Sequence, residues 1–199
     1  GVPFLYESGL HRRVTDALRR AGVEVEELSG VQPNPTIGLA RTGVEIAKKH
    51  GIEVVLGIGG GSVIDTVKAI AAGALYEGDL WDLYTGRAQP ESALPCGIVM
   101  TTASTGSEGS NGSVMTNEAT HEKRDVMSDC LRPSFVLINP ELTYTLPPFQ
   151  TACGVADMIS HVMERYFTAT ADTVLVDALA EAAIRSMITL GKRVIGEPR

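Results

Sequence analysis

The stretch Gly59-Gly60-Gly61-Ser62-Val63-Ile64-Asp65 decides the fold of this chain. It follows an apolar run, Ile52 to Ile58, that predicts a buried β-strand, and it leads into a helix predicted over 62–74. Glycines let a backbone approach an anion closely, and the first turn of a helix adds unpaired N–H groups. The stretch therefore predicts a phosphate-binding turn, with a dinucleotide as the expected ligand. The alternative is a tight turn that binds nothing, because the spacing is not the G-x-G-x-x-G fingerprint.

Helices and strands alternate on both sides of this turn. The predicted helices cover 9–21 and 36–50, the second capped by Thr36 and ended by Gly51. A short helical turn is expected at 81–84. The predicted strands cover 23–28, 52–58, 97–102 and 134–138, with a strand pair inside 112–130. This alternation is typical of an α/β fold, with a parallel sheet covered by helices.

The pattern changes at Leu146-Pro147-Pro148, where double proline marks a boundary. Two helices, 149–167 and 172–190, follow with no strand between them. We therefore expect a dinucleotide-binding domain over 1–147 and the beginning of an all-helical domain over 148–199. The chain opens without Met and without the strand that usually begins an α/β domain, so we expect it to be a fragment truncated at both ends.

Composition excludes some classes of partner. The net charge of −7 provides no basic surface for nucleic acid or anionic lipid, and no apolar run is long enough to span a membrane. Three cysteines without paired spacing indicate free thiols in a reducing, cytoplasmic setting.

Two other segments of the first domain could carry chemistry. Thr101 to Glu108 is rich in hydroxyls and follows a predicted strand, the position where ligands bind in open α/β sheets. The alternative is an ordinary loop with a helix cap. Lys123 lies on the predicted hairpin and, considered alone, is a solvated charge.

Asp157 and His161 lie four residues apart on the first helix of the second domain, so they project from one face. A carboxylate and an imidazole so placed can supply two ligands to a divalent metal. Alone, the pair is more typical of a surface hydrogen bond.

Five motifs together resemble the iron-containing (group III) alcohol dehydrogenases. They are the turn and helix over 59–71, Pro33-Asn34-Pro35, Thr101 to Glu108, Asn139-Pro140 with Thr143 to Pro148, and Gly154-Val155-Ala156-Asp157 with His161. The resemblance covers essentially the whole chain and is strongest to the butanol dehydrogenase and NADPH-dependent aldehyde reductase branch. It implies a Rossmann-like first domain that binds NAD(P), with NADP favoured.

The resemblance also implies the residues of the cofactor site. The pyrophosphate is expected at Gly60, Gly61 and Ser62, with Asp65 nearby. Asn34 is expected beside the adenosine portion and Lys123 beside the nicotinamide-side ribose. The remaining residues expected to line the cleft are Thr101, Thr102, Thr105, Thr143 and Leu146.

In the second domain the resemblance makes Asp157 and His161 two of four ligands to Fe²⁺ or Zn²⁺, the others lying beyond this chain. The implied reaction is hydride transfer between NAD(P)H and an aldehyde or primary alcohol, with the metal as Lewis acid and no catalytic side chain. The parent is expected to be a homodimer, and the isolated fragment to be inactive. The alternatives are a glycerol dehydrogenase or dehydroquinate synthase relative, or a non-catalytic nucleotide-binding module.

Overall fold

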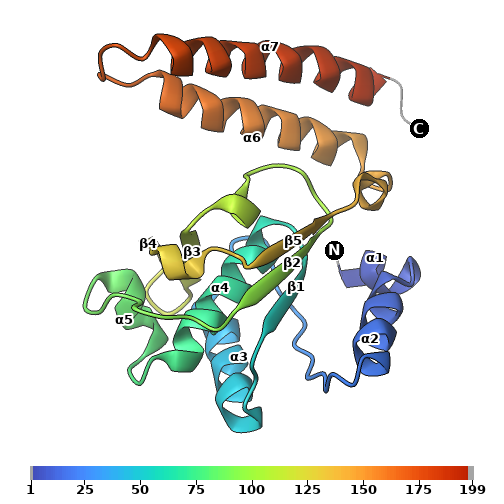
Figure 1. Ribbon diagram of the computed structural model, residues 1–199, viewed down its shortest axis with the longest axis vertical. Coiled ribbons are helices and arrows are strands. Elements are labelled where there is room, and N and C mark those ends of the chain that lie inside the picture. Colours follow the sequence, from blue (N-terminus) through green and yellow to red (C-terminus); the bar gives the residue numbers. More distant parts are fainter. Residues whose placement is uncertain (1, 197–199) are drawn as a thin grey trace.

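A computed structural model describes residues 2–196 and has two parts, an α/β unit and a helical hairpin beside it (Figure 1). The α/β unit contains a parallel sheet of three strands in the order β1-β2-β5, together with an antiparallel pair, β3 and β4. The strands are β1 (Val55–Gly59), β2 (Cys96–Met100), β3 (Gly112–Asn117), β4 (Glu122–Met127) and β5 (Phe135–Ile138). The α/β fold predicted from the alternating pattern is confirmed.

Seven α-helices lie within the described residues. They are α1 (Val2–Glu7), α2 (Leu10–Arg20), α3 (Ile37–His50), α4 (Gly61–Leu75), α5 (Leu80–Thr85), α6 (Pro148–Tyr166) and α7 (Val174–Gly196). Three short 3-10 turns accompany them: η1 (Ser107–Gly109), η2 (Asp129–Leu131) and η3 (Pro140–Thr143). The sequence did not predict α1, and α7 runs six residues beyond the predicted end at 190. Each of the other helices agrees with a predicted one to within one or two residues.

The register of the parallel sheet brings three segments to one edge. Gly59 of β1 pairs with Met100 of β2, which pairs with Ile138 of β5, so the three strands end side by side. β1 leads into the glycine turn, β2 into the hydroxyl-rich loop, and β5 into η3. Ligands of open α/β sheets bind at this edge, where the carboxyl ends of the strands meet.

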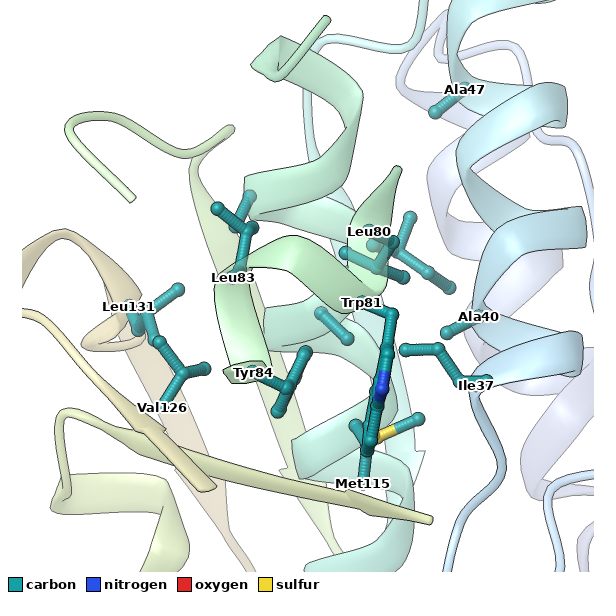
Figure 2. Close-up of a cluster of buried hydrophobic side chains, with 13 residues drawn as sticks. Ile37, Ala40, Ala47, Leu80, Trp81, Leu83, Tyr84, Met115, Val126 and Leu131 are labelled. Atoms are coloured by element: carbon teal, nitrogen blue, oxygen red, sulfur yellow. The ribbon is translucent and has the colours of Figure 1, made fainter. Parts of the chain in front are cut away.

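The core lies between α4 and its neighbours. On the side of the sheet, Ile64 and Val67 of α4 pack with Ile98 of β2. On its other side, α4 packs with α3, α5 and the β3–β4 pair. This cluster surrounds Trp81, which is 5% exposed (Figure 2). The short helical turn expected around Trp81 is thus confirmed as α5.

Two glycines of β1 serve this packing. A Cβ on Gly57 would lie 2.7 Å from a methyl of Val67, and one on Gly59 would lie 2.5 Å from a methyl of Val63. Real Cβ contacts are longer, so only glycine lets α4 approach the strand this closely. Part of the glycine content therefore has a packing role, as the alternative interpretation of the turn supposed.

Two local predictions are wrong. Residues 23–28 do not form a strand, because no neighbouring strand within the described residues pairs with them. Their alternating side chains are engaged instead by other elements: Glu27 accepts a hydrogen bond from His11, and Leu28 packs on the core. Thr36 precedes α3 but caps no amide; the carboxylate of Glu118 accepts a 3.3 Å hydrogen bond from the Gly38 N–H instead.

The helical hairpin begins at Pro148, the residue at which the sequence places the second domain. α6 and α7 lie antiparallel (Figure 1), and a Cβ on Gly191 of α7 would meet a methyl of Val155 at 2.7 Å. Large apolar side chains elsewhere on the hairpin are exposed, among them Phe149, Phe167, Leu175 and Leu179. The division into two folding domains stays a prediction. No helix within residues 2–196 is both long and apolar enough to cross a bilayer.

Candidate cofactor and metal site

The glycine turn and the hydroxyl-rich loop face each other across the edge of the sheet. A Cβ on Gly60 would lie 3.3 Å from Cβ of Thr102, and one on Gly61 would lie 3.4 Å from Oγ1 of Thr105. Gly60 precedes α4, and no side chain caps the first amides of this helix. Uncapped amides, small residues and threonine hydroxyls therefore converge at one place, and this combination suits a phosphate group.

Asp65 joins the same two segments from the second turn of α4. Its Oδ1 accepts a 3.0 Å hydrogen bond from Oγ of Ser107. Burial raises the pKa of the Asp65 carboxyl above its ordinary value, and the Ser107 hydroxyl and the Lys68 charge oppose that rise. Asp65 thus ties the loop to α4. Its expected place beside the pyrophosphate stays a prediction.

Asn34 and Lys123 form a second contact, between the Pro-Asn-Pro turn and the hairpin. Nζ of Lys123 donates a 2.9 Å hydrogen bond to Oδ1 of Asn34. Asn34 has a φ of 57°, in the left-handed region that asparagine tolerates better than most residues. The charge of Lys123 is the smallest of the causes that oppose the rise in the pKa of Asp65. The two residues were expected beside different portions of the dinucleotide, but the structure brings them into direct contact.

Ser62, Thr101, Thr143 and Leu146 have local roles. The carbonyl of Ser62 accepts from the hydroxyl of Thr66 within α4, and the Thr101 N–H donates to the Gly59 carbonyl at 3.2 Å. The hydroxyl of Thr143 donates to the Pro140 carbonyl at 2.7 Å, and Leu146 follows η3. Thr143 and Leu146 lie beyond the end of β5, and their hydrogen bonds stay within their own segment.

Asp157 and His161 lie side by side on α6. Oδ1 of Asp157 and Nε2 of His161 are 3.6 Å apart, and both side chains are partly exposed. Nitrogen and oxygen ligands bind a divalent metal at about 2.0–2.2 Å, and two such atoms on one ion can be 3.6 Å apart. The two residues therefore fit as neighbouring ligands of a divalent metal. Within residues 2–196 no third histidine, cysteine or acidic residue completes the cluster, so the pair fits part of a site.

The sequence analysis missed two residues that organise this region. Ser104 donates a hydrogen bond to Asp157, and Lys68 of α4 binds the far end of the hydroxyl-rich loop. A lysine within the apolar run Val67 to Ala72 was a detectable signal, since every residue of that run is buried. Ser104 gave no such signal, because its partner is 53 residues away in sequence.

Residues 2–140 match the protein family described as iron-containing alcohol dehydrogenase. The chain is 45% identical over 190 residues to the probable NADH-dependent butanol dehydrogenase 1 of Bacillus subtilis, covering 96% of this chain and 49% of that protein. It is 36% identical over 195 residues to the NADPH-dependent aldehyde reductase YqhD of Escherichia coli, covering 96% and 50%.

The crystal structure of NADH-dependent butanol dehydrogenase A from Thermotoga maritima superposes with a TM-score of 0.94 at 44% identity, over 98% of this chain and 49% of that one. The chain thus spans about half the length of these relatives. Since the family match covers well over half of the chain, this protein belongs to the iron-containing alcohol dehydrogenase family.

Proposed function

We propose that this chain is the cofactor-binding half of an oxidoreductase that transfers hydride between NAD(P)H and an aldehyde or primary alcohol. The observation that carries the proposal is the facing pair of segments at the sheet edge, Gly60-Gly61 and the Thr102–Thr105 loop. The relatives' names point to the same chemistry, since they include butanol dehydrogenases and an aldehyde reductase.

In this proposal the amides of Gly60, Gly61 and Ser62 bind the pyrophosphate at the start of α4. The hydroxyls of Thr102 and Thr105 donate to it from the opposite side, and Thr101 fixes the start of their loop. Asp65 keeps the far side of the loop against α4 through Ser107. Thr143 and Leu146 border the same edge.

The contact between Asn34 and Lys123 supports a change in how their roles are divided. Because their side chains are hydrogen-bonded, we propose that both serve one ribose. Lys123 then donates to the ribose hydroxyls, and Asn34 orients the ammonium.

The preference between the two nicotinamide cofactors stays a prediction. NADP was favoured from the resemblance, yet the 45% identical relative is named as NADH-dependent and the 36% identical one as NADPH-dependent. Titrating the chain with both cofactors decides this.

We propose that Asp157 and His161 hold one side of a divalent ion, with Fe²⁺ favoured by the family to which the chain belongs. Such an ion, when bound, supplies Lewis-acid polarisation of the substrate oxygen. The chain's own contribution is to keep both ligands on one face of α6, with Ser104 orienting the carboxylate.

Three broader properties stay proposals. The substrate is a small aldehyde or alcohol. The complete protein forms a homodimer. It works in a reducing, cytoplasmic compartment, where Cys96, Cys130 and Cys153 would stay free thiols, as they are in this structure.

A competition titration tests the cofactor proposal. The purified 199-residue chain should quench or shift NADH fluorescence with saturation, and ADP should displace the dinucleotide because it shares the pyrophosphate. Saturable binding that ADP reverses supports the proposal. Absence of binding to both NADH and NADPH would contradict it.

A further inference from the structure

Lys68 is a lysine with no exposed surface, in the second turn of α4. Its ammonium nitrogen lies 2.7 Å from the carbonyl oxygen of Ser107, 2.9 Å from that of Ser110 and 2.8 Å from that of Gly112. The hydroxyl of Ser110 is a fourth neighbour at 3.1 Å. An unpaired buried charge is very costly, but this one meets a ring of acceptors.

The three carbonyl oxygens match the charged form of the side chain. An ammonium group has three N–H donors, one for each carbonyl, whereas a neutral amine has two and would point its lone pair at the third oxygen. Burial lowers the pKa of Lys68 below its ordinary value, and the charge of Asp65 opposes that change. The geometry therefore assigns an ammonium ion to this position at neutral pH.

The ammonium fixes one end of the segment that carries the threonines. Ser107 begins η1, Ser110 follows it, and Gly112 begins β3. The other end of the segment is fixed where β2 delivers Thr101, whose N–H donates to Gly59. The intervening Thr102 and Thr105 thus lie on a loop whose two ends are tied to α4 and β1, the elements that flank the glycine turn.

Lys68 and Asp65 act on the loop together. They are three residues apart on α4, and both contact Ser107, the lysine at its carbonyl and the aspartate at its hydroxyl. One other cation contacts the same stretch: Arg132 donates to the Gly109 carbonyl at 2.7 Å, from a side chain that is about half exposed. A bond of that kind is weakened by water competition, so the buried ammonium is the stronger anchor.

We propose that Lys68 is a positioning residue for the cofactor site: its buried ammonium holds the loop from Thr101 to Asn111 in the conformation that presents Thr102 and Thr105 to Gly60 and Gly61. The inference rests on the proposed dinucleotide function. Without the ammonium, three carbonyls lose their donor and the loop samples other conformations. The apparent affinity for the cofactor then falls in proportion to the fraction of molecules whose threonines are correctly placed.

The test compares variants of the 199-residue chain. Lys68→Met keeps most of the side-chain volume and removes every donor. We expect NADH affinity to fall about ten- to hundredfold, and amide exchange over 103–111 to accelerate, because the loop loses its hydrogen bonds to a charged group. Lys68→Gln, which keeps two N–H donors, should give an intermediate loss and replaces Lys68→Met if that variant does not fold.

Two control variants separate positioning from general stability. Ile70→Ala creates a cavity on another face of the same helix and should lower stability while leaving NADH affinity within about twofold. Arg132→Ala removes the partly exposed cation that donates to the same loop from outside it, and should also change NADH affinity by no more than about twofold.

Chemical rescue gives a readout that lost packing alone would not produce. n-Propylammonium should restore NADH affinity to Lys68→Ala, whereas tetramethylammonium, which carries the charge but no N–H donor, should not. Wild-type affinity in Lys68→Met, or equal losses in Lys68→Met and Ile70→Ala, would overturn the inference while leaving the cofactor proposal intact. A wild-type chain that binds no nicotinamide cofactor would instead remove the proposed function itself.

Discussion

The side-chain oxygen of Ser104 lies 2.5 Å from Oδ2 of Asp157, and this hydrogen bond joins the loop after β2 to helix α6. The two backbones are also close, since a Cβ on Gly154 would lie 2.6 Å from the carbonyl oxygen of Ala103. The candidate metal ligand is therefore held by the same loop that faces the glycine turn.

Ser104→Ala should loosen this junction. Losing one hydrogen bond to a partly exposed carboxylate should lower the free energy of unfolding by about 1 kcal/mol and accelerate amide exchange in α6. Ser104→Thr keeps the hydroxyl and should lose less. Exchange mass spectrometry provides the measurement, and unchanged protection of α6 in Ser104→Ala would show that the bond contributes nothing to the junction.

The ion pair at the start of α5 predicts a pH dependence. Asp79 accepts a hydrogen bond from the Trp81 N–H, and its carboxylate also accepts from Nη2 of Arg41 at 2.7 Å and from Nε of Arg41 at 3.0 Å. The Arg41 hydrogen bond is the main cause that lowers the pKa of Asp79. A lowered folded-state pKa means that the carboxylate stabilises the fold above the unfolded value of about 3.9. That stability is lost as pH falls through the lower, folded-state pKa.

Asp79→Ala should therefore cost about 0.5–2 kcal/mol at pH 7 through the lost cap, plus a smaller amount through the exposed ion pair. Asp79→Asn, which can still cap, should cost less. Urea denaturation at pH 7 and below pH 3 provides the comparison. If the difference between wild type and Asp79→Ala is as large in acid as at neutral pH, the carboxylate charge is not its source.

His161→Ala tests the metal assignment in a full-length protein that contains this chain. Removing one of two adjacent ligands should strip the metal and abolish turnover, while cofactor affinity stays nearly intact because the glycine turn is on another element. Elemental analysis, the rate of aldehyde reduction and an NADH titration together provide the test. Metal retained at the wild-type level would reduce Asp157 and His161 to a surface pair.

The 199-residue chain alone should have no appreciable dehydrogenase activity, even with added Fe²⁺ or Zn²⁺. Within its described residues no group of three potential ligands gathers around one position, and a catalytic metal site normally needs three protein ligands. An aldehyde-reduction assay with NADPH and metal, run beside size-exclusion chromatography, measures this. Robust metal-dependent turnover by a monomer would contradict the assignment.

The features predicted from sequence are those encoded by local pattern. The apolar run ending at Ile58 and the glycines after it are enough to predict β1, the turn and α4. The double proline likewise marks the start of α6, because proline is favoured in the first turn of a helix.

The features that could not be predicted depend on neighbours distant in sequence. Residues 23–28 alternate like a strand, but a strand requires a partner, and the sequence does not say whether one is adjacent. The cap of α3 comes from Glu118, 80 residues beyond Gly38, and Ser104 meets Asp157 only after α6 packs on the loop. Local propensity carries no information about such contacts.

A pair of glycine variants tests whether the glycine turn binds a dinucleotide. Gly60 has an ordinary φ of −100°, so substitution there meets no backbone strain, but a side chain would fill the space opposite Thr102. Gly109→Ala is the matched control, because its new Cβ would meet nothing within 4 Å.

The measurement is a fluorescence titration of the chain with NADH and NADPH. We expect saturable binding in wild type and in Gly109→Ala, and its loss in a folded Gly60→Val. Equal affinity in Gly60→Val and wild type would show that the turn does not bind the dinucleotide and is a purely structural junction between β1 and α4.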